Sequence, residues 1–127
     1  MGTTEANKAA VVAFYELAFN QREPQQAVAR YMGARYRQHN PEVADGPAGF
    51  VAFASGFTRA HPQLHLEIKR VLADGEFVVL HVHARMSPED RGAVAIDIFR
   101  LEDGKIVEHW DAVQPIAEQP MHANGPF

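Results

Sequence analysis

The chain has 127 residues, 46% of them hydrophobic and 22% charged, as is typical of one globular domain with a buried core. The absence of cysteine excludes disulfide scaffolds, thiolate metal sites and cysteine nucleophiles, and a net charge of −4 without a basic run argues against a nucleic-acid partner. The apolar runs are far shorter than the roughly 20 residues that span a bilayer, and residues 1–5 lack the features of a signal peptide, so we expect a cytoplasmic protein without a membrane partner.

The first half of the chain is predicted to be mostly helical. Apolar residues recur at helical spacing after Thr4, the expected N-cap. Pro24 suits the first turn of a second helix, and Asp45-Gly46-Pro47 precedes a third helix with a phenylalanine-rich face. Asn40 precedes a proline and therefore belongs to a turn. The expected helices cover residues 5–20, 24–31 and 47–60, with a short strand over 35–38 between the last two.

The second half is predicted to be a run of strands, because the apolar period changes to two from residue 64 onward. Asp74-Gly75 and Asp103-Gly104 are signals for tight hairpins. The expected strands cover residues 64–73, 76–86, 93–102 and 105–114, followed by an irregular tail over 115–127. Helices followed by hairpin-connected strands define an α+β domain over residues 1–127. We expect a cone-shaped, curved, mixed or antiparallel sheet wrapped around three N-terminal helices, with a cavity on its concave side.

Each later strand has one face on which His or Asp stands among apolar residues. The residues on these faces are His81 and His83, then Asp97 between Ala95 and Phe99, then His109 and Asp111 between Val107 and Val113. Such groups are costly to bury unless they are hydrogen-bonded, so their faces indicate a pocket. Alternatively, the faces are exposed to water, as one side of an antiparallel sheet commonly is. Trp110 falls on the opposite face and is expected to serve packing.

Asp111 is the preferred candidate for a general base. A carboxylate among apolar side chains becomes a better proton acceptor near neutral pH, because desolvation disfavours its charged form. His109, two residues away on the same face, could orient Asp111, donate to an oxyanion or shuttle the proton. Alternatively, the two side chains form a hydrogen bond that only satisfies two buried groups.

A metal site is a further possibility on the preceding strand. His81 and His83 are two residues apart and converge on one point, and His39, His109 or Asp111 could complete the ligands. Paired histidines are nevertheless common on strands without a metal.

Two stretches also carry a family resemblance: Tyr36-Arg37-Gln38-His39-Asn40-Pro41 followed by Asp45-Gly46, and the segment from Asp97 to Asp111 that includes Asp103-Gly104-Lys105-Ile106-Val107-Glu108-His109. They resemble the SnoaL-like polyketide cyclases of the nuclear-transport-factor-2-like superfamily, and the likeness in element order covers nearly the whole chain. The resemblance implies an α+β cone, usually a homodimer, with a deep apolar pocket and no metal or organic cofactor.

The resemblance also implies roles for residues. The acid/base aspartate of the cyclases carries over to Asp111, and the histidine two residues before it to His109. Where those cyclases place a histidine and a glutamine, this sequence has Asp97 and Ala95. The implied reaction is proton abstraction next to a carbonyl of a small apolar molecule, followed by intramolecular aldol attack. The catalytic candidates are Asp111, His109, Asp97 and His39, and the substrate-binding candidates are His81, His83, Asn40, Phe14, Phe53, Phe57 and Trp110.

Several functions remain open on the same fold. An isomerase or dehydratase would use the same base, a non-catalytic domain would only hold a small apolar ligand, and a metal enzyme would use the histidine pair. We also expect a homodimer through the convex face of the sheet, where apolar side chains would otherwise be exposed. The residues expected there are Ile96, Ile98, Val78, Leu80 and Trp110.

Overall fold

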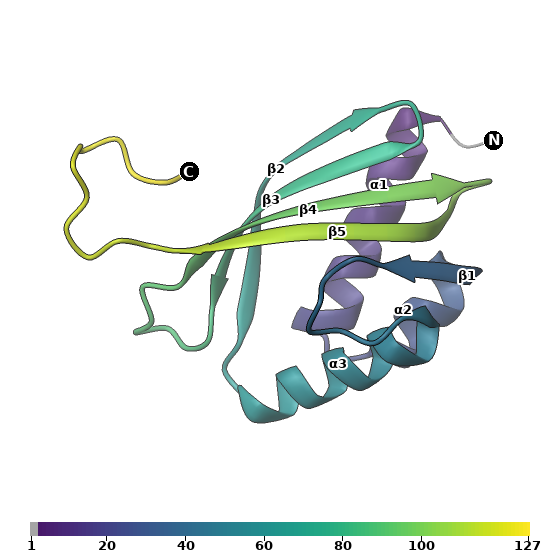
Figure 1. Cartoon of the computed structure of the whole chain (residues 1–127), viewed down its shortest axis with the longest axis horizontal. Coiled ribbons are helices and arrows are strands. Elements are labelled where there is room, and N and C mark those ends of the chain that lie inside the picture. The colour runs from purple at the N-terminus through teal and green to yellow at the C-terminus, as the bar shows by residue number, and fades with distance from the viewer. Residues whose placement is uncertain (1–2) are drawn as a thin grey trace.

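A five-stranded sheet curves around the helices in the computed structural model, which describes residues 3–127 (Figure 1). The helical segments are α1 (Thr4–Tyr15), η1 (Glu16–Asn20), α2 (Pro24–Tyr31) and α3 (Gly46–Ala60). The strands are β1 (Met32–Gln38), β2 (His65–Asp74), β3 (Phe77–Arg85), β4 (Ala93–Glu102) and β5 (Lys105–Pro115). The α+β class is therefore confirmed. Residues 1 and 2, part of the segment in which no signal peptide is expected, lie outside the described residues.

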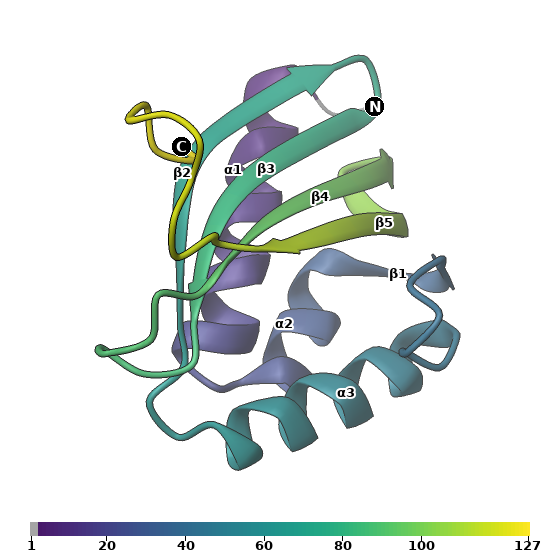
Figure 2. The ribbon, with the colours of Figure 1, turned by 60° about the vertical axis from the view of Figure 1, so that its left-hand side comes forward.

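The sheet is mixed and open. Its order is β1-β5-β4-β3-β2, in which the last four strands form the expected antiparallel meander and β1 pairs with β5 in parallel. Figure 2 shows the strands curving over α1, with α3 on the opposite side of the helical layer. The sheet forms a cone rather than a closed barrel, because β1 and β2 remain edges. Among the described residues, no helix is long and apolar enough to cross a bilayer.

The first helix differs from its expected form at both ends. Thr3 rather than Thr4 is the N-cap, since its Oγ1 accepts a hydrogen bond from the backbone N–H of Ala6 at 3.0 Å. The last turns are π-helical and form η1. At the end of η1, the amide of Asn20 pairs with the backbone of Leu66, donating to its carbonyl and accepting from its N–H, both at 2.9 Å. These two bonds tie the helix end to the edge strand β2.

A bulge changes the face alternation at the start of β5. Arg100 of β4 pairs with Glu108, while the next residue of β4 pairs with Ile106, so Val107 is an extra residue. Ile106 is fully buried in the core, whereas Val107 lies beside Arg100 on the outer side of the sheet. The expectation that Val107 shares a face with His109 is therefore wrong. Beyond the bulge the expected alternation holds.

The concave face of the sheet is buried against the helices. Val78 and Leu80 belong to this core and are fully buried, so their expected place on the convex face is wrong. The register explains the difference, because Leu80 of β3 pairs with Asp97 of β4, and both face inward. Ile96, which is 37% exposed, and Ile98 do lie on the convex face, as expected.

Candidate active site

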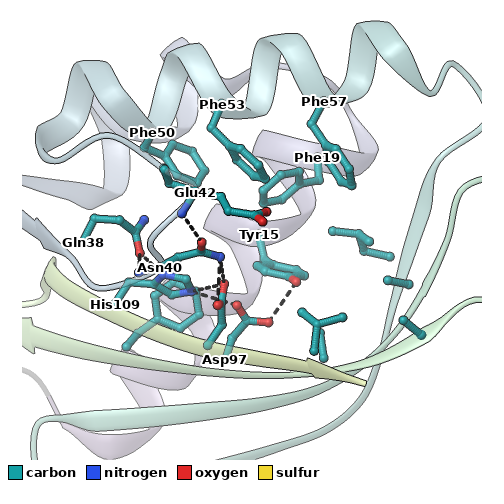
Figure 3. A pocket seen from close by; sticks show the side chains of 18 of the residues that line it. Tyr15, Phe19, Gln38, Asn40, Glu42, Phe50, Phe53, Phe57, Asp97 and His109 are labelled. Carbon is teal, nitrogen blue, oxygen red and sulfur yellow. Dashed lines mark hydrogen bonds and ion pairs between the residues drawn. The ribbon is translucent and has the colours of Figure 1, made fainter. Parts of the chain in front are cut away.

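A cavity of about 300 Å³ lies between the concave face of the sheet and the helices (Figure 3). This volume is at the lower end of the range for small-molecule pockets. One wall is aromatic, since residues three and four apart on α3 share a face and phenylalanines from α1 and η1 lie opposite them. The aromatic lining residues are Phe14, Phe19, Phe50, Phe53, Phe57 and Phe99. The polar lining residues are Tyr15, Gln38, Asn40, Glu42, Asp97, His109 and Asp111.

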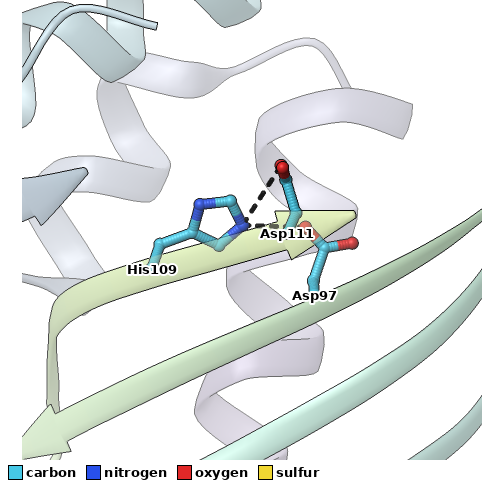
Figure 4. A group of neighbouring side chains, drawn as sticks. All are labelled: Asp97, His109 and Asp111. Atoms are coloured by element: carbon cyan, nitrogen blue, oxygen red, sulfur yellow. Dashed lines mark hydrogen bonds and ion pairs between the residues drawn. The ribbon is translucent and has the colours of Figure 1, made fainter. Parts of the chain in front are cut away.

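The polar end is built around a histidine between two carboxylates (Figure 4). The Nε2 atom of His109 lies 2.8 Å from Oδ1 of Asp97 and 3.7 Å from Oδ2 of Asp111. The β4–β5 register explains this arrangement, because Asp97 is directly opposite Asp111 and His109 is two residues earlier on the same face. The structure thus brings together the three residues that strand alternation placed on one face. The side chain of Asp97 is 6% exposed and that of Asp111 is 17% exposed, so Asp111 is the more accessible of the two carboxyl groups.

Gln38 fixes which nitrogen of His109 carries a proton. Its Oε1 atom lies 2.8 Å from Nδ1 of His109 and also accepts from the backbone N–H groups of His39 (3.1 Å) and Asn40 (3.0 Å). Its amide nitrogen donates to the hydroxyl of Tyr36 at 2.9 Å. A flipped amide would set its NH₂ group against two N–H donors, so the oxygen must face them. Nδ1 of His109 is therefore the donor in its bond to Gln38.

This assignment requires a second proton between Nε2 of His109 and the carboxyl group of Asp97. With Nδ1 protonated, the contact between Nε2 of His109 and Asp97 is a hydrogen bond only if a proton lies on Nε2 or on the carboxyl group. The two states differ by the transfer of one proton over the 2.8 Å that separates these atoms. The cluster can therefore store and release a proton beside Asp111, which general acid–base chemistry requires.

Two further groups hold the carboxylates in place. The hydroxyl of Tyr15 on α1 donates to Oδ2 of Asp97 at 3.0 Å. Burial, followed by the charge of Asp97, raises the pKa of Tyr15 well above its ordinary value, so this hydroxyl remains a donor. The amide nitrogen of Asn40 donates to both oxygens of Asp111, at 2.9 and 3.0 Å. Asn40 thus lines the cavity as predicted, whereas Tyr15 and Gln38 were not predicted from the sequence.

The same three side chains form the only group of potential metal ligands found among the described residues. One ligand atom each from Asp97, His109 and Asp111 lies within 4.8 Å of the others. Each carboxylate already accepts a hydrogen bond from Tyr15 or Asn40, and the proton between Nε2 of His109 and Asp97 would have to leave before both groups could bind a cation. This donor arrangement suits proton transfer better than metal binding.

Neither His39 nor Trp110 lines the cavity, so the catalytic assignment of His39 and the substrate-binding assignment of Trp110 are wrong. The expected place of Trp110 on the face opposite His109 is confirmed. Gln38 pairs with His109 across β1 and β5 and points inward, which turns the next residue, His39, to the outer side. The ring of His39 stacks on Trp110 with centroids 4.8 Å apart, and its Nε2 donates to Glu108 at 2.7 Å. This bond and the one from Nε of Arg100, at 2.8 Å, lower the pKa of Glu108.

The expected pocket positions of His81 and His83 are also wrong, because both lie on the outer face of β3. His81 accepts a hydrogen bond from Arg70, and burial followed by this cation lowers the pKa of His81. His83 donates from Nε2 to the carbonyl of Arg91 at 2.9 Å. Both rings pack on Phe127, with centroids 5.4 and 4.7 Å away. The predicted metal site therefore fails, since its further ligands in β5 lie on the other face of the sheet.

Comparison with known proteins agrees with this architecture. The model of the SnoaL-like domain family matches residues 11–109. TsrD from Streptomyces laurentii is 25% identical, with a TM-score of 0.68 over 84% of this chain and 89% of that chain. A protein provisionally named a polyketide cyclase from Bacillus cereus ATCC 10987 is 22% identical, with a TM-score of 0.73 over 85% of this chain and 74% of that chain.

A third solved structure is provisionally named an isomerase of the SnoaL-like family, from Agrobacterium tumefaciens str. C58. It is 17% identical, with a TM-score of 0.70 over 85% of this chain and 97% of that chain. No curated protein matches the sequence. At these low identities the structural likeness supports the fold, while the family match covers most of the sequence. The chain belongs to the SnoaL-like domain family.

Proposed function

We propose that this protein is a cofactor-independent enzyme that removes a proton from a carbon next to a carbonyl group and cyclises its substrate by an aldol-type condensation. The observation that carries the proposal is the position of His109, whose Nε2 lies between Asp97 and Asp111 at the polar end of an apolar cavity. A small apolar carbonyl compound fits this cavity in size and polarity.

Asp111 is the proposed base. It is the more exposed of the two carboxylates, and the amide of Asn40 holds both of its oxygens in place. In the first step, Asp111 takes the proton from the carbon and the electron pair of the broken C–H bond forms an enolate.

His109 is the proposed donor to the developing oxyanion. Gln38 fixes the ring through Nδ1, so Nε2 can direct its proton to the enolate oxygen. A preorganised donor of this kind contributes about 3 kcal/mol to transition-state stabilisation. The enolate carbon then forms the new bond to a second carbonyl of the substrate. The resulting alkoxide recovers a proton from the cluster, so no net proton is gained or lost.

The same cluster could return the proton to a different carbon, which would be an isomerisation, or assist loss of water. A domain that only holds a ligand would bind the same apolar compounds without proton transfer. Exchange of carbon-bound protons with solvent separates the enzymatic proposals from the binding one, because every enzymatic alternative with Asp111 as base begins with removal of such a proton.

The test is deuterium exchange at the methyl group of acetophenone in D₂O, followed by NMR with and without the protein. We expect wild-type protein to accelerate exchange and Asp111→Asn to lower the rate by about 100-fold or more, as for loss of a general base. Circular dichroism checks that the variant stays folded. Equal rates for the two proteins, or no acceleration by wild type, would rule out Asp111 as the base.

We also propose that two copies of the chain associate through the convex face of the sheet. Phe77 is 42% exposed and Ile96 is 37% exposed on this face, and Trp110 lies nearby with its ring 6.1 Å from that of Phe77. Exposed apolar side chains gathered in one patch commonly mark an interface.

A further inference from the structure

The wall of the cavity carries more acidic side chains than basic ones. Its ionisable side chains include three carboxyl groups, those of Glu42, Asp97 and Asp111, and one imidazole, that of His109. Among the described residues that line the cavity there is no Lys and no Arg. Even with His109 fully protonated, the carboxylates outnumber the cations. A bound anion would therefore meet like charge on the wall and find no cationic partner besides the histidine.

Of these three carboxyl groups, that of Glu42 takes no part in the proposed proton transfer. It lies in the loop between β1 and α3, and its backbone N–H donates to Oδ1 of Asn40 at 2.8 Å. Figure 3 shows its side chain directed into the cavity. The residue is exposed, and its carboxylate has no hydrogen bond or ion pair to the rest of the described chain. It is therefore available to a ligand at the rim.

The apolar part of the wall includes phenylalanine rings, which also favour a cation over an anion. Phe53 and Phe57 from α3 are stacked with centroids 5.3 Å apart and remain partly exposed, and Phe19 packs edge-on against Phe53 at 6.5 Å. Aromatic faces attract cations through the negative potential above the ring, and a carboxylate beside them adds direct charge attraction. A protonated amine on an apolar body suits such surroundings, whereas a carboxylate or phosphate group does not.

We propose that the cavity takes a carbonyl compound that also carries a protonated amine, with the ammonium group held between Glu42 and the phenylalanine wall, and that it excludes anionic substrates. This inference rests on the proposed function for the carbonyl group, but its charge preference is a separate property. In this arrangement the carbonyl group lies at His109 and the ammonium group lies at Glu42. Glu42 therefore sets specificity without touching the reacting atoms.

The experiment compares three probes of similar size that differ in charge: para-acetylbenzylamine, para-ethylacetophenone and para-acetylbenzoate. Dissociation constants are measured by protein-observed NMR titration at about pH 7, where the amine is protonated and the benzoate ionised. The proteins are wild type, Glu42→Gln and Glu76→Gln. Glu76 is an exposed carboxylate next to the β2–β3 turn that does not line the cavity, so its variant has the same change in net charge.

For wild type we expect the amine to bind about threefold to fivefold more tightly than the neutral probe, as for a solvent-exposed ion pair, and the benzoate to bind most weakly. Glu42→Gln should remove most of the preference for the amine, while Glu76→Gln should keep it. The preference should also shrink as salt is raised from about 20 mM to about 500 mM.

The inference is overturned if wild type binds the three probes equally, prefers the benzoate, binds none of them, or keeps its preference in Glu42→Gln. These outcomes are distinct from failure of the proposed function. Deuterium exchange of the neutral ketone measures proton removal without any cation, so loss of the charge preference with retained exchange removes only this inference. Retained preference without any exchange would instead leave a cation-selective binding domain.

Discussion

Replacement of Tyr15 by phenylalanine tests the long-range contact that holds the inner carboxylate. The substitution keeps the ring in the core and removes only the hydroxyl that donates to Asp97 at 3.0 Å. Both residues are buried, at 5% and 4% exposure, so water does not readily replace the lost donor. A hydrogen bond to a charged group contributes about 1.5–3 kcal/mol, and removing the partly offsetting cost of burying the hydroxyl leaves a net loss of about 1–2 kcal/mol. For a domain of this size, that corresponds to a melting temperature lower by about 3–8 °C.

Urea denaturation at neutral pH, followed by circular dichroism, measures this change. The matched control is Tyr31→Phe, because Tyr31 also packs against the core but its hydroxyl makes no hydrogen bond within the described residues. We expect the control to stay within about 0.5 kcal/mol of wild type. A Tyr15→Phe protein as stable as wild type, or no less stable than the control, would refute the argument that this hydroxyl supports Asp97.

Alkaline pH gives the same contact a second readout. The pKa of Tyr15 is raised in the folded state, mainly by burial, so above about pH 10 the unfolded chain loses this proton while the folded chain keeps it. The free energy of unfolding then falls as pH rises, by about 1.4 kcal/mol per pH unit for this one group. Tyr15→Phe should have a slope shallower by that amount. An unchanged slope would show that Tyr15 ionises normally.

Three further predictions concern the outer face. The lowered pKa of Glu108 means that its charged form stabilises the fold, so Glu108→Gln should lower the melting temperature at neutral pH, and the difference should vanish as the pH falls below about 4; a pH series of melting curves measures this. His81→Ala and His83→Ala should leave deuterium exchange of acetophenone unchanged, because both rings lie outside the cavity; a tenfold loss in either variant would contradict that placement. Ile96→Lys should convert the proposed dimer into a monomer in light scattering at micromolar concentration, and a wild-type monomer would remove the dimer proposal.

Strand alternation predicted the centre of the candidate site for a clear physical reason. In an antiparallel pair of strands, residues opposite one another share a face, so Asp97, His109 and Asp111 come together once β4 and β5 pair. The turn signal at Asp103-Gly104, which connects these two strands, sets that pairing. Periodicity also predicted the phenylalanine face of the helix that forms one wall.

Alternation does not show which face of a strand points inward, and this explains the errors at His81 and His83. In β3 the wholly apolar face is the buried one, while in β4 the inner face carries Asp97 and the outer face carries Ile96. Asp97 can be buried because Tyr15, 82 residues away in the sequence, and His109 complete its hydrogen bonds.

Neither the bulge in β5 nor the contact of Gln38 with His109 could be predicted from local sequence patterns. The extra residue Val107 shifts the alternation at the start of β5 without any glycine or proline to mark it. Gln38 sits beside the expected turn, but its role depends on the parallel pairing of β1 with β5, which brings it within 2.8 Å of His109, 71 residues later. Contacts of this kind depend on topology rather than on spacing.

The most direct test of the central claim is a crystal structure of the Asp111→Asn variant with para-ethylacetophenone bound. The proposed chemistry predicts that the ketone oxygen lies within hydrogen-bond distance of Nε2 of His109, at about 2.7–3.2 Å, with the methyl carbon next to the side chain of residue 111. A ketone bound with its carbonyl group toward the phenylalanine wall, or outside the cavity, would contradict a base at Asp111 and a donor at His109.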